Sequence, residues 1–185
     1  MNKQEIFQEE IKLIIDESLQ ASSRHFLETV PDYFFEVAAS STGKYHPEYA
    51  LGKGGLVRHT KAAVKIAAEL LGVSSVFNQY RYFGDSDRNL IIISLIFHDA
   101  WKHGEIHSPY TKFEHPEIAA KKVEESTFFV QEDKEYIASC IRSHMGQWNT
   151  SPRSRLVLPI PSNEAQNFVH LCDYLASRKY LELKF

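Results

Sequence analysis

The feature that most constrains the fold is an apolar run that stops at polar residues. Residues 90–97 read "LIIISLIF" and are almost unbroken hydrocarbon. His98 and Asp99 follow directly, and Lys102 comes one helical turn later. A run of this composition is typical of a segment that is buried on every side. The sequence therefore predicts a core helix, at about residues 87–101, that carries a histidine, a carboxylate and an amine at its end.

The rest of the chain shows helical periods and turn signals. Residues 3–21 predict an amphipathic helix that buries Ile6, Phe7, Ile11, Ile14, Ile15 and Leu19. Pro31 predicts the start of a short helix that runs to about Ser40, and residues 41–55 read as a loop. Further helices are expected at about 56–71, 115–126, 133–145 and 163–179. The strand signal in "RLVLPI" is discounted because of its proline. We expect an all-α domain of six to eight helices.

Length and charge exclude several classes of protein. The chain has 185 residues and a net charge of −3, which gives no overall case for a nucleic-acid scaffold or an anionic membrane partner. We therefore expect no stable binding to duplex nucleic acid. No apolar run reaches the ~18 residues of a membrane span, and the acidic N-terminus is unlike a signal peptide. Cys140 and Cys172 show no disulfide-framework spacing, so a reducing cytoplasm is the expected location.

Several predicted helices carry a metal-binding side chain on their apolar face. His59 shares its face with Ala63, Ile66, Ala67 and Leu70. His144 follows Ile137, Cys140 and Ile141, and Asp173 lies with Ala165, Val169, Cys172 and Ala176. His115 precedes Pro116, so it is expected at or next to a helix N-cap. Each residue alone could be a hydrogen-bonded core residue, although a buried carboxylate must be paired or bind a cation. Together with His98 and Asp99, they predict a metal site.

The chain resembles the HD-domain superfamily of metal-dependent phosphohydrolases in the order of its candidate ligands, which are His59, His98, Asp99, His115, His144 and Asp173. The motifs that carry the resemblance are "GGLVRHT", "FHDAWKHG", "HPEIAA", "RSHMGQW" and "LCDYLASRK". The resemblance implies a helical bundle and one HD domain over residues 1–185. In that domain the helices of residues 1–40 are accessory, and the metal-binding core covers about residues 43–180.

The resemblance is to the members that bind two divalent ions, and it implies a role for each ligand. The first ion is expected to be held by His59, His98, Asp99 and Asp173. The second is expected to be held by Asp99, His115 and His144. Asp99 and Lys102 are the expected catalytic residues, because Asp99 bridges the ions and Lys102 contacts the scissile phosphate. Ligation by nitrogen and oxygen suits Fe, Mn, Co or Zn and does not choose among them. We expect Fe or Mn, with Co or Zn as the alternatives.

The implied function is hydrolysis of a phosphoester in a nucleotide or short oligonucleotide. The stretch "MGQWNTSPRS" lacks the Gly-Tyr-Pro signature of the cyclic-di-nucleotide branch, which argues against that substrate. A tryptophan beside arginines can stack a base and hold phosphates. The expected substrate-binding residues are Arg58, Lys102, Trp148, Arg153 and Arg155. Lys44, Tyr45, His46 and residues 107–113 are further candidates.

Two other functions remain open at this point. Some HD-domain proteins with the same six ligands are di-iron oxygenases, and the ligand pattern does not separate the two chemistries. A nucleotide-sensing module with a structural metal is the third possibility, disfavoured because the ligands and Lys102 are intact. His103 and His107 are close enough to the His-Asp doublet to act as proton donors or additional ligands, and His25 and His170 are expected to be structural.

Overall fold

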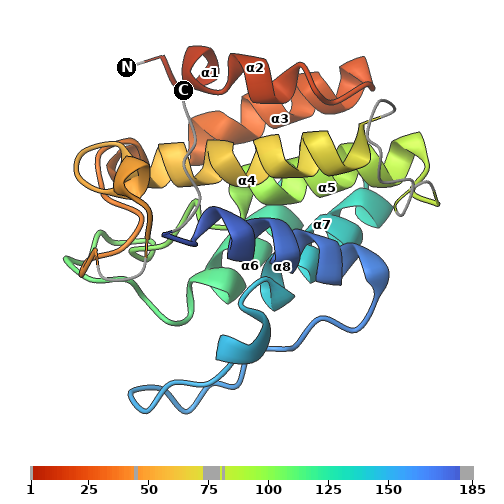
Figure 1. The fold of residues 1–185 in the computed structure, drawn as a ribbon. Helices are drawn as coiled ribbons and strands as arrows, with labels where there is room; N and C mark the ends of the chain where they lie inside the picture. The colour runs from red at the N-terminus through yellow and green to blue at the C-terminus, as the bar shows by residue number, and fades with distance from the viewer. Residues whose placement is uncertain (1, 44–45, 73–79, 81, 180–185) are drawn as a thin grey trace.

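The computed structural model describes residues 2–43, 46–72, 80 and 82–179, which form eight α-helices and no strand. The α-helices are α1 (Lys3–Ile6), α2 (Gln8–Ile11), α3 (Glu17–Thr29), α4 (Gly55–Leu71), α5 (Asp85–Phe97), α6 (His115–Glu125), α7 (Gln131–Ser143) and α8 (Glu164–Ala176). The same residues include the 3-10 helices η1 (Asp32–Phe35), η2 (Glu48–Ala50) and η4 (Gly146–Trp148). The predicted all-α fold is confirmed. Helices α4 and α5 lie between α1–α3 and α6–α8 (Figure 1).

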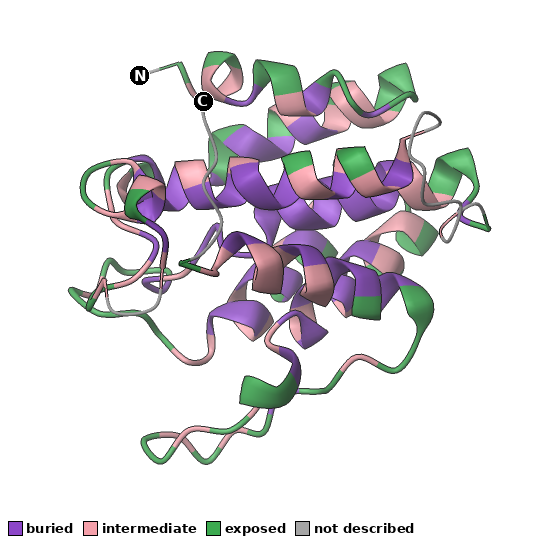
Figure 2. Ribbon diagram, in the orientation of Figure 1, coloured by how far each residue is buried: buried purple, intermediate pink, exposed green. Residues whose placement is uncertain are grey.

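Helix α5 lies in the core, as its composition predicts. Every residue from Asn89 to Phe97 is buried. Helices α2, α4, α7 and α8 all pack against it, and its ribbon is buried over most of its length (Figure 2). Each fully buried Leu, Ile or Phe contributes about 1.5–3 kcal/mol to folding. The end of α5 is therefore held in a fixed position, and His98 and Asp99 are held with it.

The chain changes its hydrogen-bond pattern where α5 ends. The predicted helix of residues 87–101 stops at Phe97, and three-residue turns follow. The Ala100 N–H donates to Phe97 O at 3.1 Å, and the Lys102 N–H donates to Asp99 O at 3.0 Å. Residues three apart eclipse each other in such turns. Lys102 therefore lies over Asp99. In a regular helix it would instead share one side with both His98 and Asp99.

The prediction of one helix over residues 3–21 is wrong. The chain breaks between α2 and α3, where the Asp16 carboxylate accepts from the amides of Ser18 at 2.8 Å and Leu19 at 3.0 Å. This N-cap starts a new helix in a new direction. Ile15, expected on the buried face, is 61% exposed, and its N–H donates to Asn89 Oδ1. The amphipathic period did not reveal the break. Asp16 would fit the polar face of one continuous helix as well as it fits the N-cap of a second one.

The segment between α3 and α4 folds over the first turn of α4. The helix predicted from Pro31 to Ser40 is reduced to the single turn of η1, and the predicted loop of residues 41–55 contains η2. A Cβ atom at Gly55 would lie 2.2 Å from Ala50 O, so glycine is needed where η2 packs against α4. This packing helps to bring His46 beside α4. Lys44 and Tyr45 lie outside the described residues.

No helix in the described part of the chain is long and apolar enough to cross a membrane. Cys140 and Cys172 are both buried free thiols. Burial raises the pKa of Cys140 to about 12, so this thiol stays neutral and packs as a small apolar side chain.

Candidate metal centre

Helices α5 and α7 each end at a histidine, and the Nε2 atoms of both rings point towards Asp99. His98 is the C-cap of α5 and His144 is the C-cap of α7. The Nδ1 of His98 lies 2.7 Å from Leu95 O, and the Nδ1 of His144 lies 2.6 Å from Ile141 O. Because a carbonyl only accepts, each Nδ1 carries a proton, so Nε2 is the ring nitrogen that faces the other site residues and can bind an ion once it is deprotonated. The negative ends of two helix dipoles also favour a cation here.

The first ligand group consists of His59, His98, Asp99 and Asp173, whose ligand atoms all lie within 4.8 Å of one another. His59 Nε2 lies 2.9 Å from Asp173 Oδ1 and 3.6 Å from Asp99 Oδ2. His98 Nε2 lies 3.4 Å from Asp99 Oδ2 and 3.5 Å from Asp173 Oδ1. Ligand atoms about 2.1 Å from one ion, at tetrahedral or octahedral angles, are about 3.0–3.4 Å apart. The observed separations fit such an ion closely.

The second ligand group consists of Asp99, His115 and His144. His115 is the first residue of α6, and its Nδ1 lies 2.6 Å from Lys112 O, so Nε2 is the ring nitrogen that faces the group. The Nε2 atoms of His115 and His144 are 3.2 Å apart, and His115 Nε2 lies 3.0 Å from Asp99 Oδ1. Two nitrogen lone pairs at this distance repel each other unless a metal ion or a proton lies between them. The arrangement therefore favours a bound cation.

Asp99 belongs to both groups and turns a different oxygen to each. Its Oδ2 faces the first group, and its Oδ1 faces the second. Oδ2 also accepts from Lys102 Nζ at 2.5 Å. Burial acts to raise the pKa of Asp99, but the charges of Lys102 and His98 outweigh it and hold this pKa well below its usual value. The carboxylate is therefore anionic, with the geometry of a bridging ligand.

The charges of the site also fit a cation. Burial acts to raise the pKa of Asp173, but the nearby rings of His59 and His98 hold this pKa well below its usual value. Burial, with nearby His98 and His115, lowers the pKa of His144 to about 3, so this ring is neutral. Burial opposes a charge on His98, yet Asp99 and Asp173 raise its pKa to about 10. Two buried carboxylates thus attract positive charge to the Nε2 of His98.

Among the residues of the two ligand groups, His59 Nδ1, His98 Nε2 and Asp99 Oδ1 are buried without a hydrogen-bond partner within the described residues. Two of these atoms, His98 Nε2 and Asp99 Oδ1, face the ligand groups, one in each. A buried polar atom without a partner costs about 1–3 kcal/mol, so such atoms are rare unless they serve a function. Metal coordination satisfies both atoms at once. The residues of the two groups therefore fit divalent ions.

A cavity of about 520 Å³ opens onto this cluster. Its lining includes Lys102, His115, His144, Trp148, Asp173 and Arg178. His59, His98 and Asp99 are buried and do not line it. The second ligand group therefore contributes both of its histidines to the cavity wall, whereas the first contributes only Asp173.

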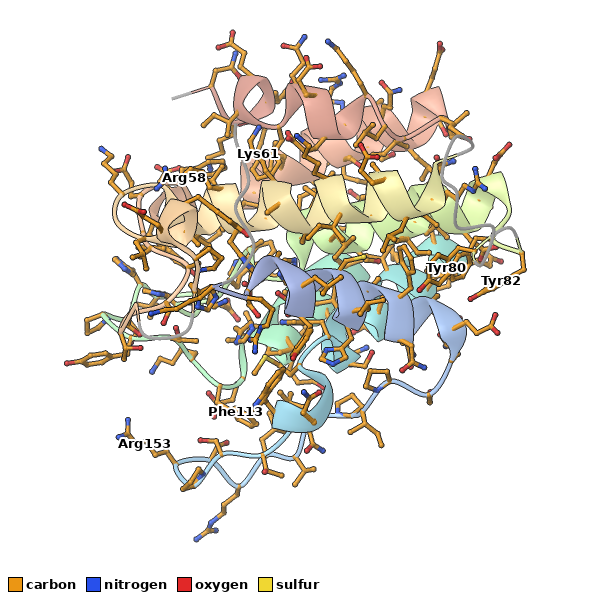
Figure 3. The ribbon with its side chains drawn as sticks, in the orientation of Figure 1. Arg58, Lys61, Tyr80, Tyr82, Phe113 and Arg153 are labelled. Atoms are coloured by element: carbon orange, nitrogen blue, oxygen red, sulfur yellow. The ribbon has the colours of Figure 1, made fainter. Side chains whose placement is uncertain are left out.

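The predicted substrate-binding residues are not all brought together. Lys102 and Trp148 line the cavity. Arg58 uses its guanidinium within the protein, because Nε donates to Tyr49 O and Nη2 to Leu51 O at 2.8 Å. Arg153 and Arg155 are exposed on the loop after η4, and Arg153 points away from the helices (Figure 3). The cation next to Trp148 is instead Arg178, whose Cζ lies 5.6 Å from the Trp148 ring centroid.

Sequence reasoning gave no role to Arg178 and treated His46 only as a loop candidate. The His46 ring centroid lies 5.3 Å from that of His59, and both His46 and Arg178 line the cavity. Burial lowers the pKa of His46 to about 3, helped by Lys102 and His59, so it is a neutral donor or acceptor. The motif "LCDYLASRK" contains Arg178 five residues after Asp173. That spacing was the available signal, but it does not show on which side the guanidinium lies.

His103 and His107 are not part of either ligand group. The Nδ1 of His103 donates to Ser108 O at 2.8 Å, and the Tyr33 ring stacks on both histidines. Tyr33 also donates its hydroxyl to Gly104 O at 2.7 Å. These contacts hold the turn that follows Lys102. In the described structure both histidines brace this turn.

His170 is structural, as the sequence indicates. Its Nδ1 donates to His144 O at 2.7 Å, so it supports the backbone of a ligand residue. A Cβ atom at Gly146, where φ is +55°, would lie 2.2 Å from His170 Cε1. Glycine is therefore needed at position 146, where the chain turns from His144 towards Trp148.

Comparison with known proteins agrees with the geometry of the site. A family model for the HD domain matches residues 56–178, which contain both ligand groups. No curated protein and no solved structure matches the chain. The match begins at the start of α4 and ends just after α8, so it leaves out α1–α3. With its buried His and Asp cluster and its all-helical fold, the chain belongs to the HD-domain family, a superfamily of metal-dependent hydrolases.

Proposed function

We propose that the protein is a metal-dependent phosphohydrolase that hydrolyses a phosphoester of a nucleotide or short oligonucleotide. The observation that carries this proposal is the position of Asp99. It turns one oxygen to each ligand group, and Lys102 lies beside it on the cavity wall. Two ions sharing a carboxylate can clamp the attacking and leaving oxygens of a phosphoryl group. We propose two ions per chain, with Fe or Mn favoured.

Each residue of the site has a role in this function. Divalent ions held there would supply a water of lowered pKa and stabilise phosphoryl oxygens. Asp99 orients that water, because both of its oxygens lie within the ligand cluster. Lys102 donates one N–H to Asp99 and has further N–H groups for a phosphate oxygen. Its positive charge offsets the negative charge that develops in the transition state.

The cavity fits a substrate of nucleotide size. Its volume of about 520 Å³ is within the usual range of ligand sites, about 300–1,000 Å³. Trp148 is 44% exposed on its wall and offers an aromatic surface to a base. Lys102 and Arg178 supply positive charge for phosphate. These features favour a nucleotide or short oligonucleotide over a neutral substrate.

We also propose the setting in which this function works. Residues 1–185 are taken as one domain, in which α1–α3 support the core, since α2 packs against both α4 and α5. The two buried free thiols suit a reducing compartment, the cytoplasm.

A hydrolysis screen that measures both inorganic phosphate and mononucleotide products tests the function. The protein would be purified without oxygen, loaded with Mn or Fe, and assayed on mononucleotides, dinucleotides and short oligonucleotides, with and without oxygen. We expect metal-dependent hydrolysis that is independent of oxygen. Asp99→Asn, which keeps the shape of the side chain but removes its charge, is the matched control and should abolish it. Turnover that consumes oxygen would instead identify an oxygenase, and nucleotide binding without turnover would identify a sensing module.

A further inference from the structure

Arg178 is a fixed cation on the cavity wall. Its Nε donates to Tyr174 O at 3.1 Å and to Ser177 Oγ at 3.2 Å, and its Nη2 donates to Ser177 Oγ at 2.7 Å. Its Cζ lies 4.2 Å from the Tyr174 ring centroid and 5.6 Å from that of Trp148. These contacts orient the guanidinium before any ligand arrives, which lowers the entropy cost of binding one.

The same guanidinium keeps unused donors and an unneutralised charge. Nη1 has no hydrogen-bond partner, and Arg178 forms no ion pair, among the described residues. Arg142 is different, because it binds the carboxylates of Glu117 and Glu124 through all three of its nitrogens. Lys102, the other cation named on the cavity wall, is paired with Asp99. Arg178 is therefore well suited to bind an anion from the cavity.

We propose that Arg178 binds a second phosphate of the substrate, which makes the preferred substrate one with two phosphate groups. This inference rests on the proposed function, in which the phosphoester that is cleaved lies at the ligand groups and Lys102. Arg178 follows Asp173 across the end of α8, so both line the same cavity. A nucleoside bisphosphate or a 5′-phosphorylated dinucleotide has the required chemistry. Trp148, which lies beside Arg178 on the wall of this cavity, offers its ring to the base.

A purely structural role for Arg178 makes a different prediction. In that case the guanidinium would only support the rings of Trp148 and Tyr174, which stack with centroids 5.7 Å apart. Its removal would then weaken the binding of every ligand by the same factor. A phosphate-binding role weakens only the ligands that carry the second phosphate. The ratio of two affinities therefore separates the roles.

The experiment is calorimetric titration of the metal-loaded protein with adenosine 3′,5′-bisphosphate and with adenosine 5′-monophosphate. Wild type should bind the bisphosphate about 10- to 100-fold more tightly, the scale of a charge-assisted contact. Arg178→Gln should reduce this ratio to about 1–3, and Arg178→Lys should restore part of it. Arg24→Gln, which removes the same charge from α3, is the matched control and should keep the wild-type ratio.

Two results would overturn the inference. One is a wild type that shows no preference for the bisphosphate, including one that binds neither compound. The other is an Arg178→Gln variant that loses affinity for both compounds equally. The failure of the proposed function looks different. In that case the preference for the bisphosphate would persist, but neither a 5′-phosphorylated dinucleotide nor its unphosphorylated counterpart would be cleaved to mononucleotide or nucleoside products.

Discussion

The two ligand groups share Asp99 but differ in charge and in access to the cavity. The first group contains two carboxylates and two imidazoles, and its histidines lie behind the cavity wall. The second contains two imidazoles and only the shared carboxylate, and both histidines line the cavity. More ligands and more negative charge favour tight retention of an ion, whereas fewer ligands leave positions for water and substrate. The comparison therefore suggests a retained ion in the first group and an ion that faces the substrate in the second.

The supports of the two groups differ as well. Helices α4, α5 and α8, which carry the first group, pack on one another in the core. The second group depends on α6 and α7, which carry His115 and His144. Arg142 of α7 joins these helices through Glu117 at 2.9 Å and Glu124 at 2.6 Å. The second group should therefore respond more to changes near the surface.

The largest expected effect is that of Asp99→Ala. This change removes the carboxylate that both groups share, so both ions should be lost or bound far more weakly. Phosphate release should fall by at least about 10³-fold, since the metals and their bound water go together. Metal analysis and steady-state kinetics on the same sample check the prediction. A variant that lost only the ion of one group would show that Asp99 does not bridge.

Lys102→Ala should have the next largest effect, and it should separate catalysis from metal binding. The ammonium contacts Asp99 but belongs to neither ligand group. We expect the metal content to stay at the wild-type level while the rate falls by about 10²- to 10³-fold, the usual cost of one transition-state charge contact. Lys121→Ala, at an exposed lysine of α6, is the matched control. A wild-type rate in the Lys102→Ala variant would contradict the proposal that Lys102 contacts the phosphate.

Metal removal should show the difference between the groups directly. After chelation, the first equivalent of Mn or Fe should raise the melting temperature more than the second, because the first group offers more ligands and charge. Saturation at about 100 times the dissociation constant adds about 2.7 kcal/mol, which is roughly 5–10 °C for a chain of this size. Differential scanning calorimetry during a metal titration measures both steps. Two equal steps would contradict the asymmetry.

Arg142→Ala should have the smallest effect and should act on the second group alone. The bonds from Arg142 to Glu117 and Glu124 are partly exposed, so their loss should cost about 1 kcal/mol or less of stability. We expect the affinity for the second equivalent of metal to fall about two- to five-fold, with no change for the first. Lys12→Ala, which breaks an exposed ion pair with Glu9 on α2, is the control. Equal weakening of both equivalents would show that α6 and α7 do not support one group selectively.

The residues of the two candidate ligand groups were predictable because each one breaks a local pattern. A histidine or carboxylate on an apolar helical face is visible in one helix at a time, and His59, His144 and Asp173 were all found in this way. The end of α5 was equally visible, since its apolar run stops at His98. The sequence could therefore predict which side chains point inward, and the structure shows that they meet.

Other features were not predictable because they depend on distant contacts. The Arg58 guanidinium donates to the carbonyls of Tyr49 and Leu51, so it is not directed at the cavity. These carbonyls belong to a segment without a helical or strand period, so the sequence did not predict the contacts. Arg178 is placed near Trp148 by its hydrogen bonds to Tyr174 O and Ser177 Oγ. The sequence does not reveal these contacts, so it did not identify Arg178 as a substrate-binding residue. The expected pairing of Trp148 with Arg153 and Arg155 followed closeness in sequence. Both arginines are instead exposed and absent from the cavity lining, and Arg153 points away from the helices (Figure 3).

If two separable ion sites share Asp99, removing both histidines of the second group should remove one ion and leave the other bound. The measurement is metal per chain by mass spectrometry, after anaerobic purification and loading, for wild type and for the His115→Ala, His144→Ala double variant. We expect about two ions per chain in wild type and about one in the double variant, with the remaining ion held by the first group. A double variant that binds as much metal as wild type and turns over substrate at the same rate would contradict this expectation.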